Sequence, residues 1–165
     1  MRRIINSTYI TLDGAVEDPR LWPSQGDAGA AASFDIQNEL LQSCDALIMG
    51  RRTYNAFASV WPTRSGDARS DRINTMKKYA VSSTLQNPAW SNTEVIGRDV
   101  VVEVTKLKQQ SGKDIVQSGL GQVPFTLMEH GLMGDPLVGA SPPLGKQRAP
   151  DSPLSRLQAD STGPC

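Results

Sequence analysis

A short, uninterrupted apolar run near residue 47 limits the fold more than any other feature of the sequence. Residues 46–49 read Ala-Leu-Ile-Met, and Gly50 ends the run. Helical patterns lie on both sides of it, and an apolar run in that setting is typical of a strand with both faces buried. Strands of this kind belong to parallel sheets that helices cover, so the run predicts an α/β domain.

The first 130 residues alternate in the same way between strand and helix patterns. Val100–Gln110 fits either structure, because three consecutive valines favour a strand. We assign a helix there, since Val100, Val104 and Leu107 share one helical face. The predicted strands are 4–12, 46–49, 78–82, 93–96 and 114–117. The predicted helices are 33–44, 54–61, 100–110 and 124–131, and Thr53 is the predicted cap of the second one. Residues 15–33 are a predicted loop. Residues 63–76 are predicted to form a loop or a short helix.

Charge and cysteine content exclude several classes of function. The 17 basic residues balance the 17 acidic ones, and such a chain offers no broad electrostatic surface to nucleic acid or an acidic membrane. Cys44 and Cys165 have no paired spacing, which excludes a disulfide framework and a cysteine zinc site. The sequence contains no metal-spaced cluster, no long apolar run and no secretory signal. We therefore expect a cytoplasmic protein that acts on a small molecule.

Three predicted strand ends carry residues suited to a nucleotide, because ligands of open α/β sheets gather beyond the carboxyl ends of the strands. Arg51 and Arg52 stand where a helix begins, and guanidinium groups beside free amides bind phosphate, although two solvated arginines would look the same. The turn 119–122, Gly-Leu-Gly-Gln, lets a backbone approach a pyrophosphate, or is an ordinary glycine-rich turn. Ser82 and Ser83 offer hydroxyls that suit a ribose phosphate or cap a turn.

Two carboxylates are candidates for proton transfer. Asp13 precedes Gly14 at the end of the first predicted strand, and Asp35 opens the first predicted helix. Either carboxylate could hold or protonate a polar heterocycle. Asp13 is equally typical of a turn, and Asp35 is equally typical of a favourable partner for the helix dipole.

Five segments together resemble a known family in the correct order. The chain is similar, over residues 2–133, to the dihydrofolate-reductase-like domain at the C-terminus of the bacterial bifunctional riboflavin deaminase-reductase, which also occurs as a stand-alone protein. The resemblance implies a three-layer α/β fold around a central, mostly parallel sheet. The segments that carry it are Arg3–Gly14, Ala46–Tyr54, Lys78–Leu85, Asp114–Gly121 and Leu127–Leu132.

The resemblance implies an NADPH-dependent oxidoreductase that passes a hydride to a pterin-like or ribosylamino-pyrimidine substrate, as in riboflavin biosynthesis. Asp13 and Asp35 are then the candidate catalytic residues, Trp22 and Tyr54 the candidate substrate contacts, and a homodimer is expected where the fold is complete. Two alternatives stay open, a non-catalytic nucleotide-binding module and an inactive truncated gene product. The candidate NADPH-binding residues are Gly50, Arg51, Arg52, Thr53, Ser82, Ser83, Gly119, Leu120, Gly121 and Gln122.

The resemblance stops near residue 133. The family continues with a strand of the type Arg-x-Trp-Val-His-Pro and two more strands, whereas residues 134–165 hold 14 Pro, Gly or Ser residues and no aromatic. This composition predicts a disordered tail, and the C-terminal strands of the fold would be missing. Permitted codons for residues 134–142, read one base later, spell Gly-Ile-Arg-Ser-Trp-Val-His-Pro. We therefore suspect a frameshift near codon 134, with a natural divergent tail as the alternative; the genomic DNA distinguishes the two.

Overall fold

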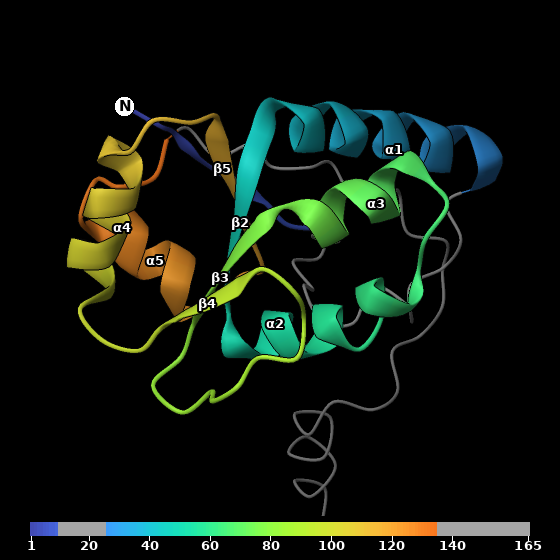
Figure 1. Ribbon diagram of the computed structural model, residues 1–165. Coiled ribbons are helices and arrows are strands. Elements are labelled where there is room, and N and C mark those ends of the chain that lie inside the picture. The colour runs from blue at the N-terminus through green and yellow to red at the C-terminus, as the bar shows by residue number, and fades with distance from the viewer. Residues whose placement is uncertain (10–25, 135–165) are drawn as a thin grey trace, which may run out of the picture.

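One sheet of five parallel strands forms the centre of the protein. The strands lie side by side in the order β1 (Ile4–Ser7), β5 (Asp114–Ser118), β2 (Cys44–Gly50), β3 (Lys77–Val81) and β4 (Thr93–Ile96) (Figure 1). The computed structural model describes residues 1–9 and 26–134, and the side chains of residues 1–9 and 35–134. Each pairing in the sheet is parallel, so the carboxyl ends of the strands lie along one edge.

Helices cover both faces of this sheet and complete three layers (Figure 1). They are α1 (Gly26–Ser43), α2 (Arg51–Ala58), α3 (Ala68–Thr75), α4 (Val100–Gln109) and α5 (Gln122–Glu129), with a short 3-10 helix at Trp61–Thr63. Successive residues of a strand point to opposite faces. Leu47 and Met49 therefore pack with α1, α2 and α3, whereas Ile48 packs with α4 and α5. The predicted α/β architecture with a central parallel sheet is confirmed.

Helix α1 begins earlier than the sequence pattern indicates. The prediction placed a loop over residues 15–33, yet α1 starts at Gly26. Residues 28–32 are mostly alanine, which favours a helix without giving any apolar periodicity to detect. The predicted strand 4–12 is seen as β1, which ends earlier, at Ser7, and residues 10–12 lie outside the described part of the chain.

The start of α2 differs in detail from the prediction, whereas α3 agrees with it. Thr53 does not cap α2, because Gly50 occupies the N-cap position and the helix begins one residue later. Residues 63–76 were predicted as a loop or a short helix, and the helical alternative is confirmed by α3, which begins after Asp67. The Asp67 carboxylate accepts hydrogen bonds from the backbone N–H groups of Arg69 and Ser70, and so satisfies two of the free donors at the helix start. The ambiguous segment of valines is a helix, α4, as assigned.

Strand β1 forms one edge of the sheet. On one side it pairs with β5, and on the other the backbone N–H of Gly134 donates to the carbonyl of Ile4 at 3.0 Å. Just before that point, the Lys108 ammonium at the end of α4 donates to the carbonyl of Leu132 at 2.5 Å. The chain that follows α5 therefore reaches the sheet along β1.

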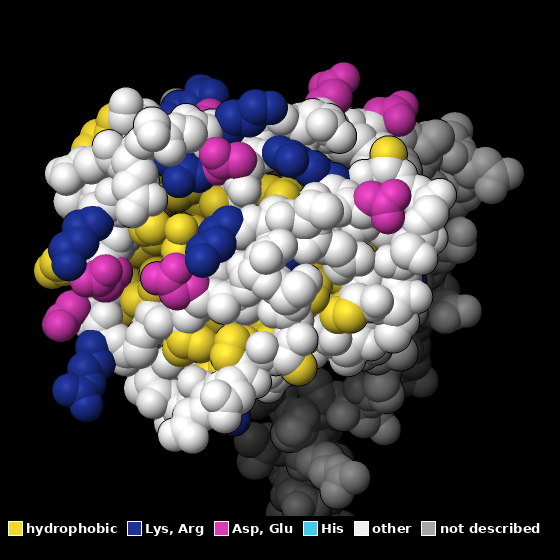
Figure 2. All heavy atoms as spheres, in the orientation of Figure 1, with side chains coloured by type: hydrophobic (Ala, Val, Ile, Leu, Met, Phe, Trp, Pro, Cys, Tyr) yellow, Lys and Arg dark blue, Asp and Glu magenta, His cyan; other side chains and the backbone are white. Residues whose placement is uncertain are grey.

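The surface shown in Figure 2 carries basic and acidic side chains interspersed over the same face, with no extended region of one sign. This distribution agrees with the balanced charge of the sequence. Among residues 1–9 and 26–134, no helix combines the length and the apolar character that a membrane crossing requires.

Candidate functional site

The three segments predicted to bind a nucleotide meet at the carboxyl edge of the sheet. Gly50 at the end of β2 is in register with Val81 of β3, and Met49 is in register with Ser118 of β5. The parts of the chain that follow these three strands therefore begin side by side. They include the predicted segments 50–53, 82–84 and 119–122.

Direct contacts join these segments. Gly119 has a φ of +93°, and a Cβ atom at this position would lie only 2.2 Å from the Thr53 Oγ1 atom. The glycine therefore allows the turn after β5 to lie against the first turn of α2. On the other side, the Arg51 guanidinium donates a hydrogen bond to the Thr84 hydroxyl. Each of the three segments thus touches another.

Two helix N-termini open at this edge without a side-chain cap. Gly50 is the N-cap of α2 and Gly121 is the N-cap of α5, and neither helix receives a capping hydrogen bond from a side chain of the described residues. By contrast, α3 lies elsewhere and has Asp67 as its cap. Unpaired N–H groups and the positive end of the helix dipole favour an anion. Both uncapped ends and the two arginines of segment 50–53 therefore suit phosphate groups.

Ser82 holds the turn after β3. Its hydroxyl oxygen accepts hydrogen bonds from the N–H groups of Thr84 at 3.2 Å and Leu85 at 3.0 Å. The turn-capping alternative is therefore realised, and the hydroxyl hydrogen is still available as a donor. Ser82 itself is half-buried, whereas Ser83, Arg51 and Arg52 are exposed.

The other predicted site residues are Asp35, Tyr54, Asp13 and Trp22. Asp35 is exposed on α1, which reaches the carboxyl end of β1 through a 2.9 Å hydrogen bond from Gln37 to Ser7. Asp13 and Trp22 lie outside the described residues.

Tyr54 is a core residue in this structure. Its side chain is 3% exposed, its ring lies against Trp90 with 6.4 Å between centroids, and its hydroxyl accepts a hydrogen bond from the Trp90 N–H. A substrate could reach Tyr54 only by displacing core side chains. Its placement therefore does not support the substrate contact predicted for it.

Two buried polar side chains beneath the glycine turn, Asn6 and Gln117, were not among the predicted site residues. They occupy paired positions on β1 and β5, and they are 8% and 0% exposed. A signal for them exists in the sequence, since each is an amide residue that directly follows two β-branched residues near a strand end. That signal acquires meaning only when the pairing of the two strands is known.

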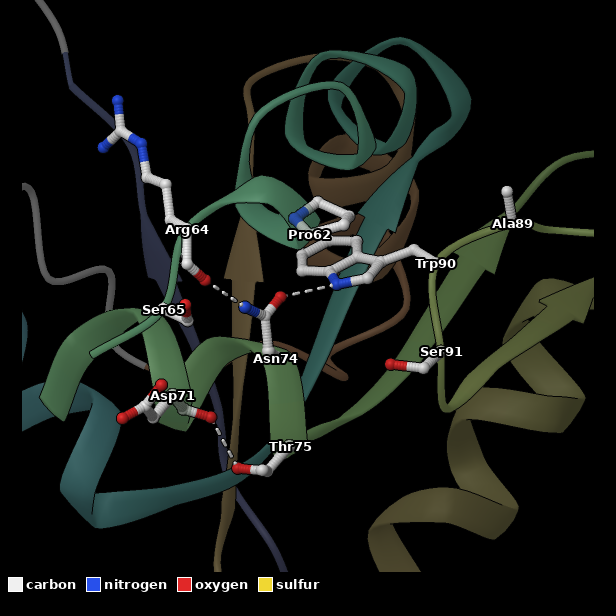
Figure 3. Close-up of a pocket in the computed structure, with 9 residues that line it drawn as sticks. All are labelled: Pro62, Arg64, Ser65, Asp71, Asn74, Thr75, Ala89, Trp90 and Ser91. Atoms are coloured by element: carbon white, nitrogen blue, oxygen red, sulfur yellow. Dashed lines mark hydrogen bonds between the residues drawn. The ribbon is translucent and has the colours of Figure 1, made fainter. Parts of the chain in front are cut away.

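A separate hollow of about 510 Å³ lies away from these strand ends (Figure 3). Its lining residues include Asn74 and Ser91, which precede β3 and β4. The side chain of Asn74 is already engaged, since it donates to the carbonyl of Arg64 at 3.0 Å and accepts from the Trp90 indole at 2.9 Å. None of the described residues predicted to bind a nucleotide lines this hollow.

Comparison with known proteins identifies the family. The model of the RibD C-terminal domain matches residues 2–144. The chain belongs to the RibD C-terminal domain family. The match runs past residue 133, where the resemblance read from the sequence stops.

Two known proteins resemble this RibD C-terminal domain protein over most of its length. The uncharacterised protein YyaP of Bacillus subtilis (strain 168) is 27% identical over 139 residues, which cover 81% of this chain and 71% of YyaP. A crystal structure from Shewanella sp. PV-4, of a protein whose name assigns it provisionally to riboflavin biosynthesis, matches with a TM-score of 0.55 at 17% identity. The match covers 90% of this chain and 86% of that one. This likeness confirms the predicted dihydrofolate-reductase-like fold.

Proposed function

We propose that this protein is an NADPH-dependent reductase that binds the phosphates of its cofactor where segments 50–53, 82–84 and 119–122 meet. The observation that carries the proposal is the close approach of Gly119 to Thr53, which brings two uncapped helix starts and two arginines to one edge of the sheet. Membership of the RibD C-terminal domain family, a family of reductase domains, supports it.

The residues at this edge fit a dinucleotide with a third phosphate. Backbone N–H groups of the turn 119–122 and of the α5 N-terminus suit the pyrophosphate. The guanidinium groups of Arg51 and Arg52 suit the 2′-phosphate, because arginine binds phosphate with two parallel donors. The hydrogen bond to Thr84 holds the Arg51 side chain over the turn after β3, so less of its freedom is lost on binding. Bound NADPH would supply a hydride.

The proposed substrate is a pterin-like or ribosylamino-pyrimidine compound. The family membership and the provisional name of the Shewanella protein support this class. Of the two candidate carboxylates, Asp35 lies in the described part of the chain, exposed on the helix that reaches the carboxyl end of β1. A carboxylate there would hold a polar heterocycle by accepting hydrogen bonds from its ring N–H groups.

Fluorescence titration with NADPH and NADH tests the cofactor assignment. We expect the wild type to bind NADPH saturably and more tightly than NADH. Arg51→Gln is expected to weaken NADPH about ten- to hundredfold and NADH much less, since it removes a charge-assisted hydrogen bond to the 2′-phosphate. The matched control is Arg64→Gln, which removes an arginine that lies over the Trp61 ring and is expected to change neither affinity.

The outcome that contradicts the assignment is a wild type without saturable NADPH binding, or equal weakening by the two arginine substitutions. Oxidation of NADPH with dihydrofolate, or with the ribosylamino-pyrimidine of riboflavin biosynthesis, then separates a reductase from a module that only binds the nucleotide. A protein that binds NADPH and oxidises it with neither compound would not have the proposed substrate class.

A further inference from the structure

Two buried amide side chains form a hydrogen-bonded pair directly beneath the glycine turn. Asn6 and Gln117 face each other across the pairing of β1 with β5. The Asn6 Nδ2 group donates to the Gln117 Oε1 atom. Buried polar side chains are costly unless they are hydrogen-bonded, so a buried pair of this kind requires a reason.

The Gln117 side chain reaches the backbone of the turn. Its Nε2 group donates to the carbonyl of Ser118 and to the carbonyl of Gly119, both at 2.9 Å. Both hydrogens of the amide are therefore used, and its oxygen is used by Asn6. Because Asn6 donates to that oxygen, the Gln117 amide is oriented with its nitrogen toward the turn.

The contact between Gln117 and the turn also determines where the backbone N–H groups of the turn point. In a trans peptide the C=O and the following N–H point in opposite directions. Since the Ser118 and Gly119 carbonyls point inward to Gln117, the N–H groups of Gly119 and Leu120 point outward from the sheet. Among the described residues, neither N–H meets a backbone acceptor. Successive outward N–H groups in a turn form a concave binding site for an anion.

We infer that Gln117, oriented by Asn6, is a positioning residue that aims the N–H groups of Gly119 and Leu120 at the pyrophosphate of a dinucleotide. This inference rests on the proposed function, because the dinucleotide is NADPH there. Gln117 is fully buried and does not touch the ligand; it acts through the turn. The approach of Gly119 to Thr53 holds the same turn from its other side.

The test uses Gln117→Leu, which keeps the volume and removes both donors. NADPH and adenosine 2′,5′-bisphosphate are titrated in parallel, because the second ligand keeps the 2′-phosphate and lacks the pyrophosphate. We expect NADPH to bind about ten- to hundredfold more weakly while the bisphosphate affinity stays within about twofold. Ser70→Ala is the matched control, since it also removes a hydrogen bond of a buried side chain, in α3, and is expected to leave both affinities unchanged.

Amide hydrogen exchange provides a readout that needs no ligand. Gln117→Leu is expected to accelerate exchange in residues 118–122 and to leave the β3 amides at their wild-type rates. Asn6→Leu, which frees the Gln117 amide to rotate, is expected to give the same pattern to a smaller extent, and it decides the question if Gln117→Leu does not fold.

Equal weakening of both ligands, or unchanged NADPH affinity with unchanged exchange, would overturn the inference. If the wild type itself binds no NADPH, the proposed function fails, and the role of Gln117 is then decided by the exchange rates alone. Faster exchange confined to residues 118–122 would support its positioning role, and unchanged rates would refute it.

Discussion

Replacing Gly119 by alanine is expected to remove nucleotide binding, while the same replacement at Gly66 is not. The alanine Cβ would lie 2.2 Å from the Thr53 Oγ1 atom and 3.3 Å from its Cβ atom. Thr53 sits in α2, where its χ1 angle is restricted to two rotamers, and rotation about χ1 leaves its Cβ atom in place. The turn must therefore shift, and the N–H groups of the turn shift with it.

The backbone of Gly119 adds a second cost. Its φ of +93° lies in the left-handed region, which an alanine adopts only with strain of about 1–3 kcal/mol. We expect Gly119→Ala to lose about that amount in free energy of unfolding, measured by urea denaturation, and to bind NADPH at least about a hundredfold more weakly.

Gly66→Ala is the matched control for this experiment. Gly66 lies outside the proposed site, its φ of +87° imposes a similar backbone strain, and its Cβ would meet no atom within 4 Å. The double variant Gly119→Ala with Thr53→Ala removes the 2.2 Å contact with the Oγ1 atom and keeps the backbone strain, so it is expected to regain part of the affinity. Equal affinities for the two single alanine variants would show that the Gly119 contact does not shape the site.

Lys78→Met is expected to lower the free energy of unfolding by about 2 kcal/mol at neutral pH. Lys78 is completely buried in β3, and its ammonium donates to the carbonyls of Asn74 at 2.7 Å, Met76 at 2.8 Å and Ser91 at 3.2 Å. The same ammonium lies 4.5 Å from the centroid of the Trp90 ring, within the range of a cation–π contact. Methionine fills the volume and leaves the three carbonyls without this donor.

Lys77→Met provides the control on the neighbouring residue. Lys77 is 46% exposed and forms a 3.0 Å ion pair with Glu94 at the surface. Exposed pairs of this kind contribute at most about 1 kcal/mol. A loss at Lys77 as large as the loss at Lys78 would contradict the role assigned to the buried ammonium.

The wild type and Lys78→Met are also expected to differ in how their free energy of unfolding depends on pH. Burial lowers the pKa of Lys78 from 10.5 to about 8. Between these pH values the unfolded chain holds the extra proton, so the free energy of unfolding rises with pH. Relative to Lys78→Met, the wild type is therefore expected to gain up to about 3 kcal/mol as the pH rises from 7 through 10.5. Burial also raises the pKa values of Cys44 and Tyr79. Both proteins contain these two groups, so their contributions cancel when the free energies of unfolding of the two proteins are subtracted. A difference that stays constant over this interval would contradict the assignment.

The sequence predicted the centre of this fold better than its details. The apolar run 46–49 is a strand buried on both faces, and periodicity chose correctly between helix and strand at α4. The order of strand ends brought segments 50–53, 82–84 and 119–122 together as expected, because carboxyl ends of parallel strands share one edge. These features depend on patterns that are local in the chain.

The features that were missed depend on contacts distant in the chain. Tyr54 was predicted to meet a substrate, yet Trp90, 36 residues later, covers it and uses its hydroxyl. Gln117 was read as a strand residue only, and its role depends on Asn6, 111 residues away. A pattern over a few neighbouring residues does not show which face of a helix or strand a distant part of the chain will cover.

The contact between Lys78 and Trp90 also equips the protein with an optical reporter of its own. Trp90 is 2% exposed and belongs to the loop before β4, whereas the turn at Gly119 follows β5. The sequence has two other tryptophans, Trp22 and Trp61, and replacing both by phenylalanine would leave Trp90 as the single emitter. Trp90 emission would then report the packing around Lys78, and NADPH emission would report binding at the glycine turn. Unfolding and ligand binding could therefore be observed at two wavelengths in one sample.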